Sequence, residues 1–504
     1  MTVTRRVFMA ALAAAAAQPA FSRRAHAEGE PFSHEQVIAL AEALSKKRYK
    51  ARPMVPEAWQ TLTYDQYRAM QFDTKKAMWR ESPSSYEVDF FAPGLYFPRS
   101  VQVFEVMNGM ALPVPFEMDK FKIYDHVALP DLPVDETLGY SGLRLRTFLD
   151  VPGKKTEYAV FQGASYFRAI GVGQTYGLSA RGLALNTGDP EGEEFPDFTH
   201  FWIERPDAEQ RDVVVHALLD SPSVSGAYRF DISPGEAAVI DIQATLFPRE
   251  DLEHVGIAPL TSMFLFDEKD RSRFDDFRPA VHDSDGLLMK NGVGETIWRP
   301  LSNPRELQVS SFVDENPKGF GLMQRARDLD DFADFEALYH NRPSLWVEPM
   351  GDWGAGVVRL VEIPADREIY DNIVAYWRPT EPLAAGSRTD LSYRLTWGRK
   401  APGEGGLPRV ANTLMGRDFD GKQLAVIEFE PHPMHEGDLE DIDIHVSSPH
   451  IELNPPILQR NPVTGGLRLA FSYEPGDRTA AEMRAQLRRN GENISEIWLY
   501  RWTS

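Results

Sequence analysis

The sequence predicts an all-β protein built from two sandwich domains, and three observations lead to this prediction. From Tyr86 onward, apolar and polar residues alternate in many short segments, and a period of two is the pattern of half-buried strands. Pro, Gly, Asp and Asn separate these segments at short intervals, as turns do in a sandwich. The chain has no cysteine, so burial of apolar side chains must stabilise its core without disulfides.

One amphipathic helix is expected before the strands. Ser33 and Gln36 have the spacing of a capping box, and Phe32 and Val37 are placed to form a hydrophobic staple. Apolar residues then recur at helical spacing up to Leu44. In the large domain, strands are expected over residues 85–90, 213–218, 227–232, 239–242, 357–363 and 373–377.

A change in composition at residues 378–387 predicts a domain boundary. This stretch reads Arg-Pro-Thr-Glu-Pro-Leu-Ala-Ala-Gly-Ser, and prolines followed by small residues are typical of linkers. We expect a large β-sandwich over residues 28–380 and a smaller immunoglobulin-like sandwich over residues 385–504. In the smaller domain we expect a short helix over residues 479–487 and strands over residues 390–397, 423–429, 442–446, 467–473 and 497–502.

Residues 1–27 have the features of an export signal. Arg5 and Arg6 precede an apolar, alanine-rich run that ends at Phe21 and is too short to span a bilayer. Ala25-His26-Ala27 is a small-x-small site, which predicts cleavage after Ala27. The arginine pair favours twin-arginine export, and a Sec signal with a chance arginine pair is the alternative. Both routes place the mature protein in the periplasm.

The charge of the chain excludes several classes of partner. The formal net charge is -21, and the expected signal carries four arginines and no acidic residue, so its removal leaves a more acidic protein. Nucleic acids and anionic membrane surfaces are therefore unsuitable partners. A neutral polysaccharide is compatible with such a surface, because sugar hydroxyls donate hydrogen bonds to carboxylates. The alternative is that most of these acidic residues simply keep the protein soluble.

Residues 282–377 combine carboxylates, glycines and aromatic residues repeatedly. Aromatic faces can stack on sugar rings, and carboxylates bind hydroxyls and transfer protons. No thiolate metal site is possible without cysteine, and no phosphate-binding loop is present, so we expect neither a metal nor a cofactor. The motifs are His282-Asp283-Ser284-Asp285-Gly286, Ile297-Trp298-Arg299-Pro300, Leu338-Tyr339-His340, Gly351-Asp352-Trp353-Gly354 and Tyr370-Asp371-Asn372.

Several longer strings are too specific to be generic. Among them are Gly163-Ala164-Ser165-Tyr166-Phe167-Arg168-Ala169, Phe201-Trp202-Ile203-Glu204-Arg205-Pro206, Gly256-Ile257-Ala258-Pro259-Leu260-Thr261-Ser262 and Asn316-Pro317-Lys318-Gly319-Phe320-Gly321-Leu322. The chain resembles the periplasmic glucan biosynthesis proteins OpgG and OpgD (also called MdoG and MdoD), and its twin-arginine signal resembles the OpgD branch.

The resemblance implies both a fold and a function. The implied fold is a galactose-mutarotase-like β-sandwich followed by an immunoglobulin-like domain. The implied role is in making osmoregulated periplasmic glucan, whose backbone is β-1,2-linked glucose, and OpgD-type members are similar to inverting endo-β-1,2-glucanases. The implied partners are β-1,2-glucan, the inner-membrane glucan synthase and a second copy of the chain in a homodimer, although the oligomeric state stays open.

An inverting glycosidase needs one carboxylic acid and one carboxylate base. Asp371 is our candidate acid and Asp283 our candidate base acting through water, since both match the acidic pair that the resemblance implies. We expect Asp371 to be partly desolvated, because it precedes an apolar strand. We expect Asp283 to be solvated in a turn, which it could also simply stabilise. The reserve candidates are Asp285, Asp352 and Glu348.

The remaining candidates would contact sugar or water. Tyr339 matches a position beside the cleavage site in similar enzymes, where its hydroxyl would order water or a sugar hydroxyl; an ordinary half-buried tyrosine is the alternative. One or two of the tryptophans are expected to stack on sugar, because aromatic residues in sandwiches often belong to the core. For Arg299, the alternative is a structural ion pair. The candidate substrate-binding residues are Trp298, Arg299, Trp346, Asp352 and Trp353.

The leading hypothesis is therefore a cofactor-free, inverting endo-β-1,2-glucanase of the periplasm. Two alternatives share the same groove. In one, the protein binds nascent glucan without hydrolysing it and presents it for assembly. In the other, it is a transglycosylase that uses the same acid but excludes water.

Overall fold

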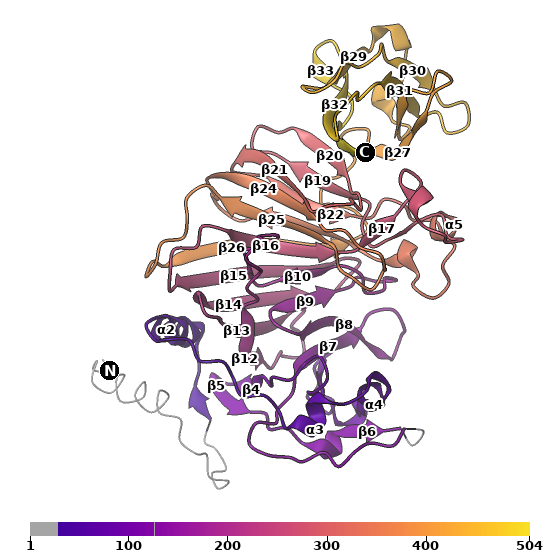
Figure 1. The fold of residues 1–504 in the computed structure, drawn as a ribbon. Helices are drawn as coiled ribbons and strands as arrows, with labels where there is room; N and C mark the ends of the chain where they lie inside the picture. Colours follow the sequence, from indigo (N-terminus) through magenta and orange to yellow (C-terminus); the bar gives the residue numbers. More distant parts are fainter. Residues whose placement is uncertain (1–28, 125–126) are drawn as a thin grey trace.

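The computed structural model describes residues 29–124 and 127–504, so the expected signal and its cleavage site after Ala27 lie outside the described residues. Strands dominate the described chain, which confirms the all-β prediction. Figure 1 shows one large β unit and, at the top of the view, a small unit formed by the C-terminal residues. In the described part of the chain, no helix has the length and apolarity needed to cross a membrane.

The longer sheet has 16 strands and runs through both units. Its strands follow in the spatial order β1 (Glu30–Pro31), β5 (Met110–Pro113), β4 (Gln102–Met107), β12 (Asp197–Glu204), β13 (Val213–Asp220), β14 (Val224–Ser233), β15 (Ala238–Pro248), β26 (Thr389–Gly398), β23 (Ser344–Pro349), β22 (Gly319–Met323), β19 (Gly286–Lys290), β20 (Thr296–Pro300), β34 (Ile497–Thr503), β32 (Ala480–Arg489) and β29 (Asp443–Ser447), with β33 (Glu492–Asn493) paired to β32.

The second large sheet has 10 strands and carries the candidate site. Its order is β21 (Gln308–Glu315), β24 (Ala355–Glu362), β25 (Ile373–Pro379), β16 (Val255–Ser262), β10 (Ser179–Arg181), β9 (Tyr166–Ala169), β8 (Lys155–Gln162), β7 (Gly142–Phe148) and β3 (Glu87–Phe91), with β11 (Ala184–Leu185) paired to β16.

Smaller elements complete the fold. The small sheets are β2 (Met70–Phe72) with β6 (Phe121–Ile123), β17 (Phe264–Phe266) with β18 (Val281–His282), and β27 (Val410–Arg417), β28 (Gln423–Phe429), β31 (Leu467–Tyr473) and β30 (Ile457–Arg460). The α-helices are α2 (His34–Ser45), α3 (Glu57–Gln60), α4 (Tyr64–Arg68) and α5 (Leu329–Phe332). The 3₁₀ turns are η1 (Thr74–Lys76), η2 (Met118–Lys120), η3 (Arg271–Arg273), η4 (Tyr339–Asn341), η5 (Pro433–His435) and η6 (Leu439–Asp441).

Helix α2 begins where the sequence predicts. Ser33 and Gln36 form the capping box, and the Ser33 backbone N–H donates to Gln36 Oε1 at 2.8 Å. Val37 and Ala41 are fully buried against strands of the long sheet, together with Leu218 and Phe247. The helix therefore covers part of the outer face of that sheet (Figure 1).

The main core lies between the two large sheets. Strand β9 illustrates the alternation: Phe167 is buried in this core, whereas Tyr166 and Arg168 are only partly buried on the opposite face. On β14, Phe230 and Ile232 reach the same core from the long sheet. Apolar residues at a period of two thus hold the layers together, and the outer face of the shorter sheet carries polar side chains such as Arg168 as well as a small apolar cluster of Val361, Val374 and Tyr376.

The small unit begins later than the sequence predicts. The first strand expected for it, residues 390–397, is β26, which pairs with β15 and β23 in the long sheet. The expected boundary at 380–385 is thus one strand too early. The predicted helix at 479–487 is also wrong, because these residues form β32, whose Ala481, Met483, Ala485 and Leu487 are buried in alternation.

The two units share the long sheet. β20 pairs in parallel with β34, through Ile297 with Ile497 and Trp298 with Trp498. The isoleucines belong to the main core, whereas the tryptophans belong to a second core beneath the small sheet of β27, β28, β31 and β30. One sheet therefore forms a wall of both cores.

Candidate active site

The candidate site lies where β16 ends and β25 begins. Asp371 precedes β25 by two residues, and Ser262 at the end of β16 pairs with Ile373. β10 and β9 follow β16 in the sheet, and Arg168 of β9 lies on the face away from the core. Loops at this end of the sheet bring together residues that are far apart in the sequence.

Asp371 is more exposed than the sequence predicts. Its side chain is 39% accessible, and its Oδ2 lies 3.8 Å from Arg168 Nη2. The prediction that Asp371 is partly desolvated by the strand is wrong, because its residue ends a loop and only Asn372 turns inward. The buried Asn372 amide bonds Phe264 and fixes the start of β25, which holds Asp371 at the surface.

Asp283 is buried, whereas the sequence predicts a solvated turn. Its side chain is 5% accessible and forms an ion pair with Arg342. Burial raises the pKa of Asp283, the guanidinium of Arg342 opposes this increase, and the negative charge of Asp371 adds to it. The two candidate carboxylates are therefore close enough for their charges to interact, although 88 positions separate them in the sequence.

Tyr339 belongs to the same network. It is 2% exposed in η4, and its hydroxyl donates to Glu368 Oε2 at 2.9 Å. The guanidinium of Arg342 lies 4.3 Å from the centre of the Tyr339 ring. Burial, together with the charge of Glu368, holds the pKa of Tyr339 above its ordinary value, so the phenol stays protonated and can donate.

Arg278 joins three loops around this network and was not predicted from the sequence. It bonds Asp276 Oδ2 at 2.8 Å in its own loop, Asp334 Oδ2 at 2.7 Å in a second loop and Glu368 Oε2 at 2.8 Å in a third. We call these four residues the Arg278 clasp. Hydrogen bonds from Arg278 lower the pKa of Asp276, although its partial burial opposes the shift.

Each clasped loop carries at least one exposed apolar side chain. Phe277, Phe335 and Ile369 are 80%, 81% and 73% accessible. Such exposure on an ordered loop beside a polar site suits contact with a ligand that has both apolar and hydroxylated faces. Neither Arg278 nor Glu368 lies in a recognisable sequence motif. The only signal for Glu368 is its position three residues before Asp371.

Trp298 and Trp346 do not face the candidate site, so their prediction as stacking platforms is wrong. They are 4% and 2% accessible and belong to the second core. Trp298 packs across Gly286, where an added Cβ would lie 2.1 Å from the indole ring. Trp346 packs over Gly319 in the same way, at 2.3 Å. These neighbouring glycines and aromatic residues serve packing between the two units.

Arg299 is also structural. It is 1% accessible and its Nη2 lies 3.1 Å from Glu362 Oε2, a carboxylate that is equally buried. Glu362 Oε1 also accepts the backbone N–H of Ser302 at 2.7 Å. The structure therefore supports the alternative, in which Arg299 forms a structural ion pair. The prediction that Arg299 binds sugar hydroxyls is wrong.

Trp353 and Asp352 lie at the opposite end of the sheet from Asp371. Both precede β24, whereas Asp371 follows it by nine residues, and the eight residues of β24 span about 26 Å. Asp352 is exposed, and Trp353 packs 6.2 Å from the ring of Trp377 and 6.0 Å from that of Tyr393. The structure does not bring them together with the candidate pair.

The reserve carboxylates are also separate from the pair. Asp285 is buried, and its Oδ2 accepts the backbone N–H groups of Arg325 and Ala326 at 2.8 and 3.1 Å, which is a structural role. Glu348 lies in β23 of the long sheet, opposite Arg394. The structure thus brings Asp283, Asp371 and Tyr339 together and leaves the other candidates elsewhere.

Sequence comparison shows to which family the chain belongs. Residues 32–502 match the family described as "Periplasmic glucan biosynthesis protein, MdoG". The chain belongs to the MdoG family. The match extends through both β units and includes every residue of the candidate site.

Curated members of the MdoG family are similar over almost the whole chain. "Glucans biosynthesis protein G" of Bradyrhizobium diazoefficiens is 46% identical over 494 residues, covering 98% of each protein. The protein of the same name from Rhodopseudomonas palustris is 45% identical over 505 residues, covering 99% of this chain and 100% of the relative. That from Shewanella frigidimarina is 47% identical over 478 residues, covering 94% and 85%.

Proposed function

We propose that this MdoG-family protein acts on periplasmic glucan as an inverting endo-β-1,2-glucanase that trims the glucan backbone. The observation that most supports the proposal is the pairing of Asp283 with Asp371 beside Tyr339. A glycosidase of this type uses two carboxyl groups on opposite sides of the scissile bond, with room for a water molecule. The names of the relatives support glucan biosynthesis as the wider process.

In this proposal Asp371 is the general acid. It lies at the surface where a sugar can contact it, and a bound chain would displace its water. Loss of solvent raises the pKa of a carboxyl group, so glucan binding would itself favour the protonated form. The guanidinium of Arg168 lies 3.8 Å from this carboxyl group in the free protein.

Asp283 is the general base, acting through water. Burial raises the pKa of Asp283, so it is a stronger proton acceptor than an ordinary aspartate, while Arg342 keeps its carboxylate charged and oriented. Tyr339, whose hydroxyl proton is directed to Glu368, offers its oxygen lone pairs to a water molecule or sugar hydroxyl.

A product assay with purified mature protein and linear β-1,2-glucan tests this proposal. Hydrolysis should release short β-1,2-linked oligosaccharides and new reducing ends, and Asp371→Asn should abolish their release without changing the fold. Turnover by a correctly folded Asp371→Asn protein would remove Asp371 from the mechanism. Glu81→Gln, an exposed acidic residue far from the site in sequence, is a control that should leave turnover unchanged.

A second candidate function is glucan binding without hydrolysis, in support of assembly. One observation favours it: the relatives carry the name "Glucans biosynthesis protein G", which refers to synthesis rather than to hydrolysis. Binding of glucan with no product would support this candidate, and new linkages would support a transglycosylase. The inner-membrane glucan synthase and a second copy of the chain are the partners that such an assembly role would involve.

The proposed location is the periplasm, in agreement with the family's description. We further propose twin-arginine export and a place in the OpgD branch, both on the basis of Arg5 and Arg6. Replacing this pair by lysines should block export of the precursor by the twin-arginine route. Unchanged export of that variant would support a Sec signal instead.

A further inference from the structure

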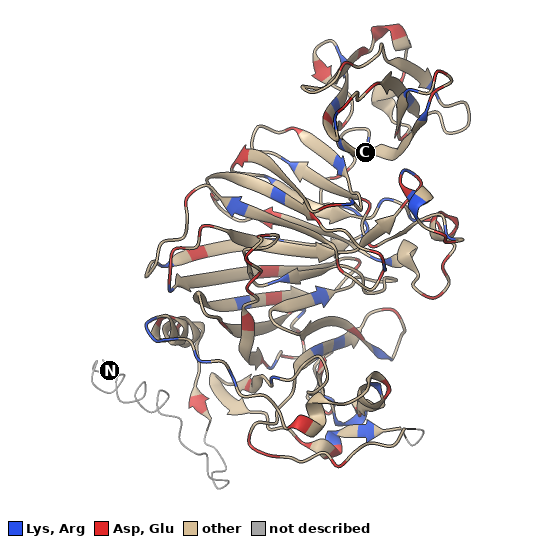
Figure 2. Cartoon of the chain, viewed as in Figure 1, with Lys and Arg blue, Asp and Glu red and all other residues tan. Residues whose placement is uncertain are grey.

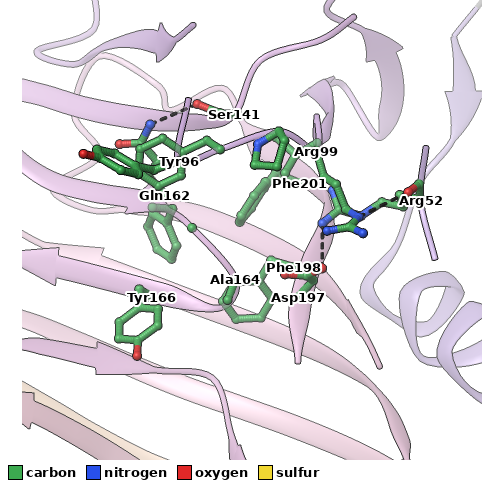
Figure 3. A pocket seen from close by; sticks show the side chains of 15 residues that line it. Arg52, Tyr96, Arg99, Ser141, Gln162, Ala164, Tyr166, Asp197, Phe198 and Phe201 are labelled. Atoms are coloured by element: carbon green, nitrogen blue, oxygen red, sulfur yellow. Dashed lines mark hydrogen bonds and ion pairs between the residues drawn. The ribbon is translucent and has the colours of Figure 1, made fainter. Parts of the chain in front are cut away.

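A small pocket opens at the turn that joins β8 to β9 (Figure 3). Its volume is about 140 Å³, enough for a group the size of one sugar ring. Gly163 and Ala164 form the turn, and Gly163 has a φ of +79°, which favours glycine. An added Cβ at Gly163 would lie 3.0 Å from the ring of Phe97, so the glycine lets Phe97 pack beside the opening.

Polar groups lie on opposite sides of this pocket. In Figure 3, Tyr96 and Gln162 lie on one side, and Arg52, Arg99 and Asp197 lie on the other. Arg52 is neutralised by Asp197, with Nη2 and Oδ2 3.1 Å apart. Among the described residues, the guanidinium of Arg99 is left without a carboxylate, and its N–H groups can donate to a sugar hydroxyl.

The hydrogen-bonding groups of the pocket are oriented before any ligand binds. Gln162 Nε2 donates to Ser141 Oγ at 2.9 Å and to Tyr67 Oη at 3.2 Å, which directs the amide. Among the described residues, nothing donates to Gln162 Oε1 and nothing accepts from the Nη groups of Arg99. The pocket thus offers a free acceptor on one side and free donors on the other.

An exposed aromatic ring completes the pocket. Tyr96 is 70% accessible at the rim, and no described residue bonds its hydroxyl. Aromatic faces of this kind stack on the apolar face of a sugar ring, while groups at the edges bond its hydroxyls. The chemistry of the pocket is therefore that of a site for a neutral sugar.

The pocket is connected to the candidate active site through β9. Tyr166 lines the pocket, and Arg168, which contacts Asp371, follows two residues later on the same face of the strand. Two strand residues span about 7 Å. The charge of Asp371 also contributes to raising the pKa of Tyr166, after the larger effect of burial. A chain bound across Asp371 would reach the pocket along this strand.

We propose that this pocket binds one glucosyl unit of a glucan chain whose neighbouring units cross Asp283 and Asp371. Tyr96 stacks on the sugar ring, Gln162 Oε1 accepts from a hydroxyl and Arg99 donates to another on the opposite side. This inference rests on the proposed function, because it takes glucan as the ligand. It adds a binding site, beyond the residues that carry out the reaction, which sets the chain length that the protein prefers.

Calorimetric titration with β-1,2-glucan fractions of defined length tests the proposal. The parent protein is Asp371→Asn, which should bind glucan without cleaving it. Adding Tyr96→Ala or Gln162→Ala should weaken binding of long chains about five- to thirtyfold and leave the shortest bound chain unaffected. Phe419→Ala, an exposed aromatic residue of the small unit, is the matched control and should change nothing. Because Tyr96 is exposed, its loss should leave the thermal unfolding midpoint unchanged.

Each contrary result has a distinct meaning. Equal affinity of the parent and both pocket variants for long glucan would overturn the pocket assignment and leave the proposed function intact. Failure of the folded parent to bind any β-1,2-glucan would overturn both. Binding of inorganic phosphate that Arg99→Ala removes, with glucan binding unchanged, would make the pocket an anion site and overturn the proposal.

Discussion

At the residue scale, burial and neighbouring charges set the pKa of Asp283: burial raises it, and the guanidinium of Arg342 opposes this increase. The pairing of Asp283 with Asp371 and Tyr339 was expected only from the resemblance to the OpgD-like enzymes. Its burial was not, because the covering residues come from distant loops: Arg342 follows η4 and contacts Asp283 only after folding. The motif His-Asp-Ser-Asp-Gly has the composition of an exposed turn. The sequence around Asp283 does not indicate that a distant loop covers it.

Replacing Arg342 by alanine should raise the pKa of Asp283 further, since it removes the charge that opposes the effect of burial. A base must be ionised to act, so activity falls as the pH drops below its pKa. The acidic limb of the kcat/KM profile should therefore move to higher pH in Arg342→Ala and much less in Arg342→Lys. Identical acidic limbs in wild type and Arg342→Ala would show that Asp283 does not control this limb.

Trp298 shows a different limit of residue-scale prediction. An aromatic residue beside an arginine and near glycines is compatible with either a sugar platform or a packed interface. Whether Trp298 binds sugar or packs in an interface depends on which face of β20 the small unit covers. No local sequence pattern shows which face this is. The guanidinium of Arg325 lies 3.6 Å from the ring centre of Trp298, and both side chains are enclosed between the units.

At the element scale, strands were predicted well wherever alternation agreed with residue propensity. β28 and β31 have the predicted bounds of 423–429 and 467–473. β32 was predicted as a helix because Ala, Glu, Met, Arg, Gln and Leu favour helices. Its neighbours β34 and β29 pair with it on both sides, and this tertiary pairing outweighs the weak local preference.

The Arg278 clasp connects three loops, and its loss should loosen them together. Arg278→Ala should lower the free energy of unfolding by about 1–2 kcal/mol, a modest value because Glu368 is partly exposed. Hydrogen–deuterium exchange should rise in residues 274–279, 333–338 and 364–371 at once. Faster exchange confined to the first segment would contradict the clasp.

The same clasp should fail at acid pH. Burial alone would raise the pKa of Asp334. This effect is outweighed by hydrogen bonds that the carboxylate accepts from the backbone N–H of Ala337, from Arg278 and from the backbone N–H of Glu336, so the pKa is lowered. A carboxyl group with a depressed pKa in the folded protein stabilises it above the ordinary value of 3.8, and the contribution is lost as the pH falls through the lowered pKa. Thermal unfolding should therefore show the wild type and Arg278→Ala converging below about pH 4, and a constant difference there would contradict the assignment.

At the scale of the whole molecule, the long sheet makes the two units interdependent. The linker composition at 378–387 predicted a boundary, yet β26 beyond it returns to the large unit and β34 closes the chain against β20. The composition of residues 378–387 indicates a solvent-exposed turn. It does not predict to which unit the next strand belongs. Two cores on opposite faces of one sheet follow from this crossing.

The ion pair between Arg325 and Glu496 should couple the units energetically. Their side chains are 4% and 2% accessible and 2.7 Å apart, and Glu496 Oε2 also accepts the N–H of Val410. Arg325→Ala leaves a buried carboxylate without its cation and should cost about 3–5 kcal/mol. Urea unfolding should show a single transition in the wild type and an earlier, separate transition of the small unit in the variant.

An exposed ion pair provides the matched control for this variant. Arg388 pairs with Asp390 at 2.9 Å, with side chains 52% and 57% accessible, so Arg388→Ala should change stability by less than about 1 kcal/mol. An equal loss of stability in both variants would contradict the role of the buried pair. Two separate transitions in the wild type would contradict the shared sheet as the coupling element.

The distribution of charge across the molecule also bears on function. Acidic and basic residues are interspersed along both units in the view of Figure 2. The formal net charge of -21 opposes binding of nucleic acid. A neutral chain bound by stacking and hydroxyl contacts should therefore show affinity that depends weakly on salt, unlike a polyanion.

The proposed roles of Asp371 and Asp283 are tested most directly by the product assay on linear β-1,2-glucan with three proteins: wild type, Asp371→Asn and Asp283→Asn. The wild type should release oligosaccharides with an inverted anomeric configuration, and either variant should lose at least about a hundredfold in rate, because removal of a proton-transfer group typically costs 10²–10⁴-fold. All three proteins should keep the same affinity for glucan within about tenfold. Equal product release by wild type and both variants would contradict the central claim that these two carboxylates cleave the chain.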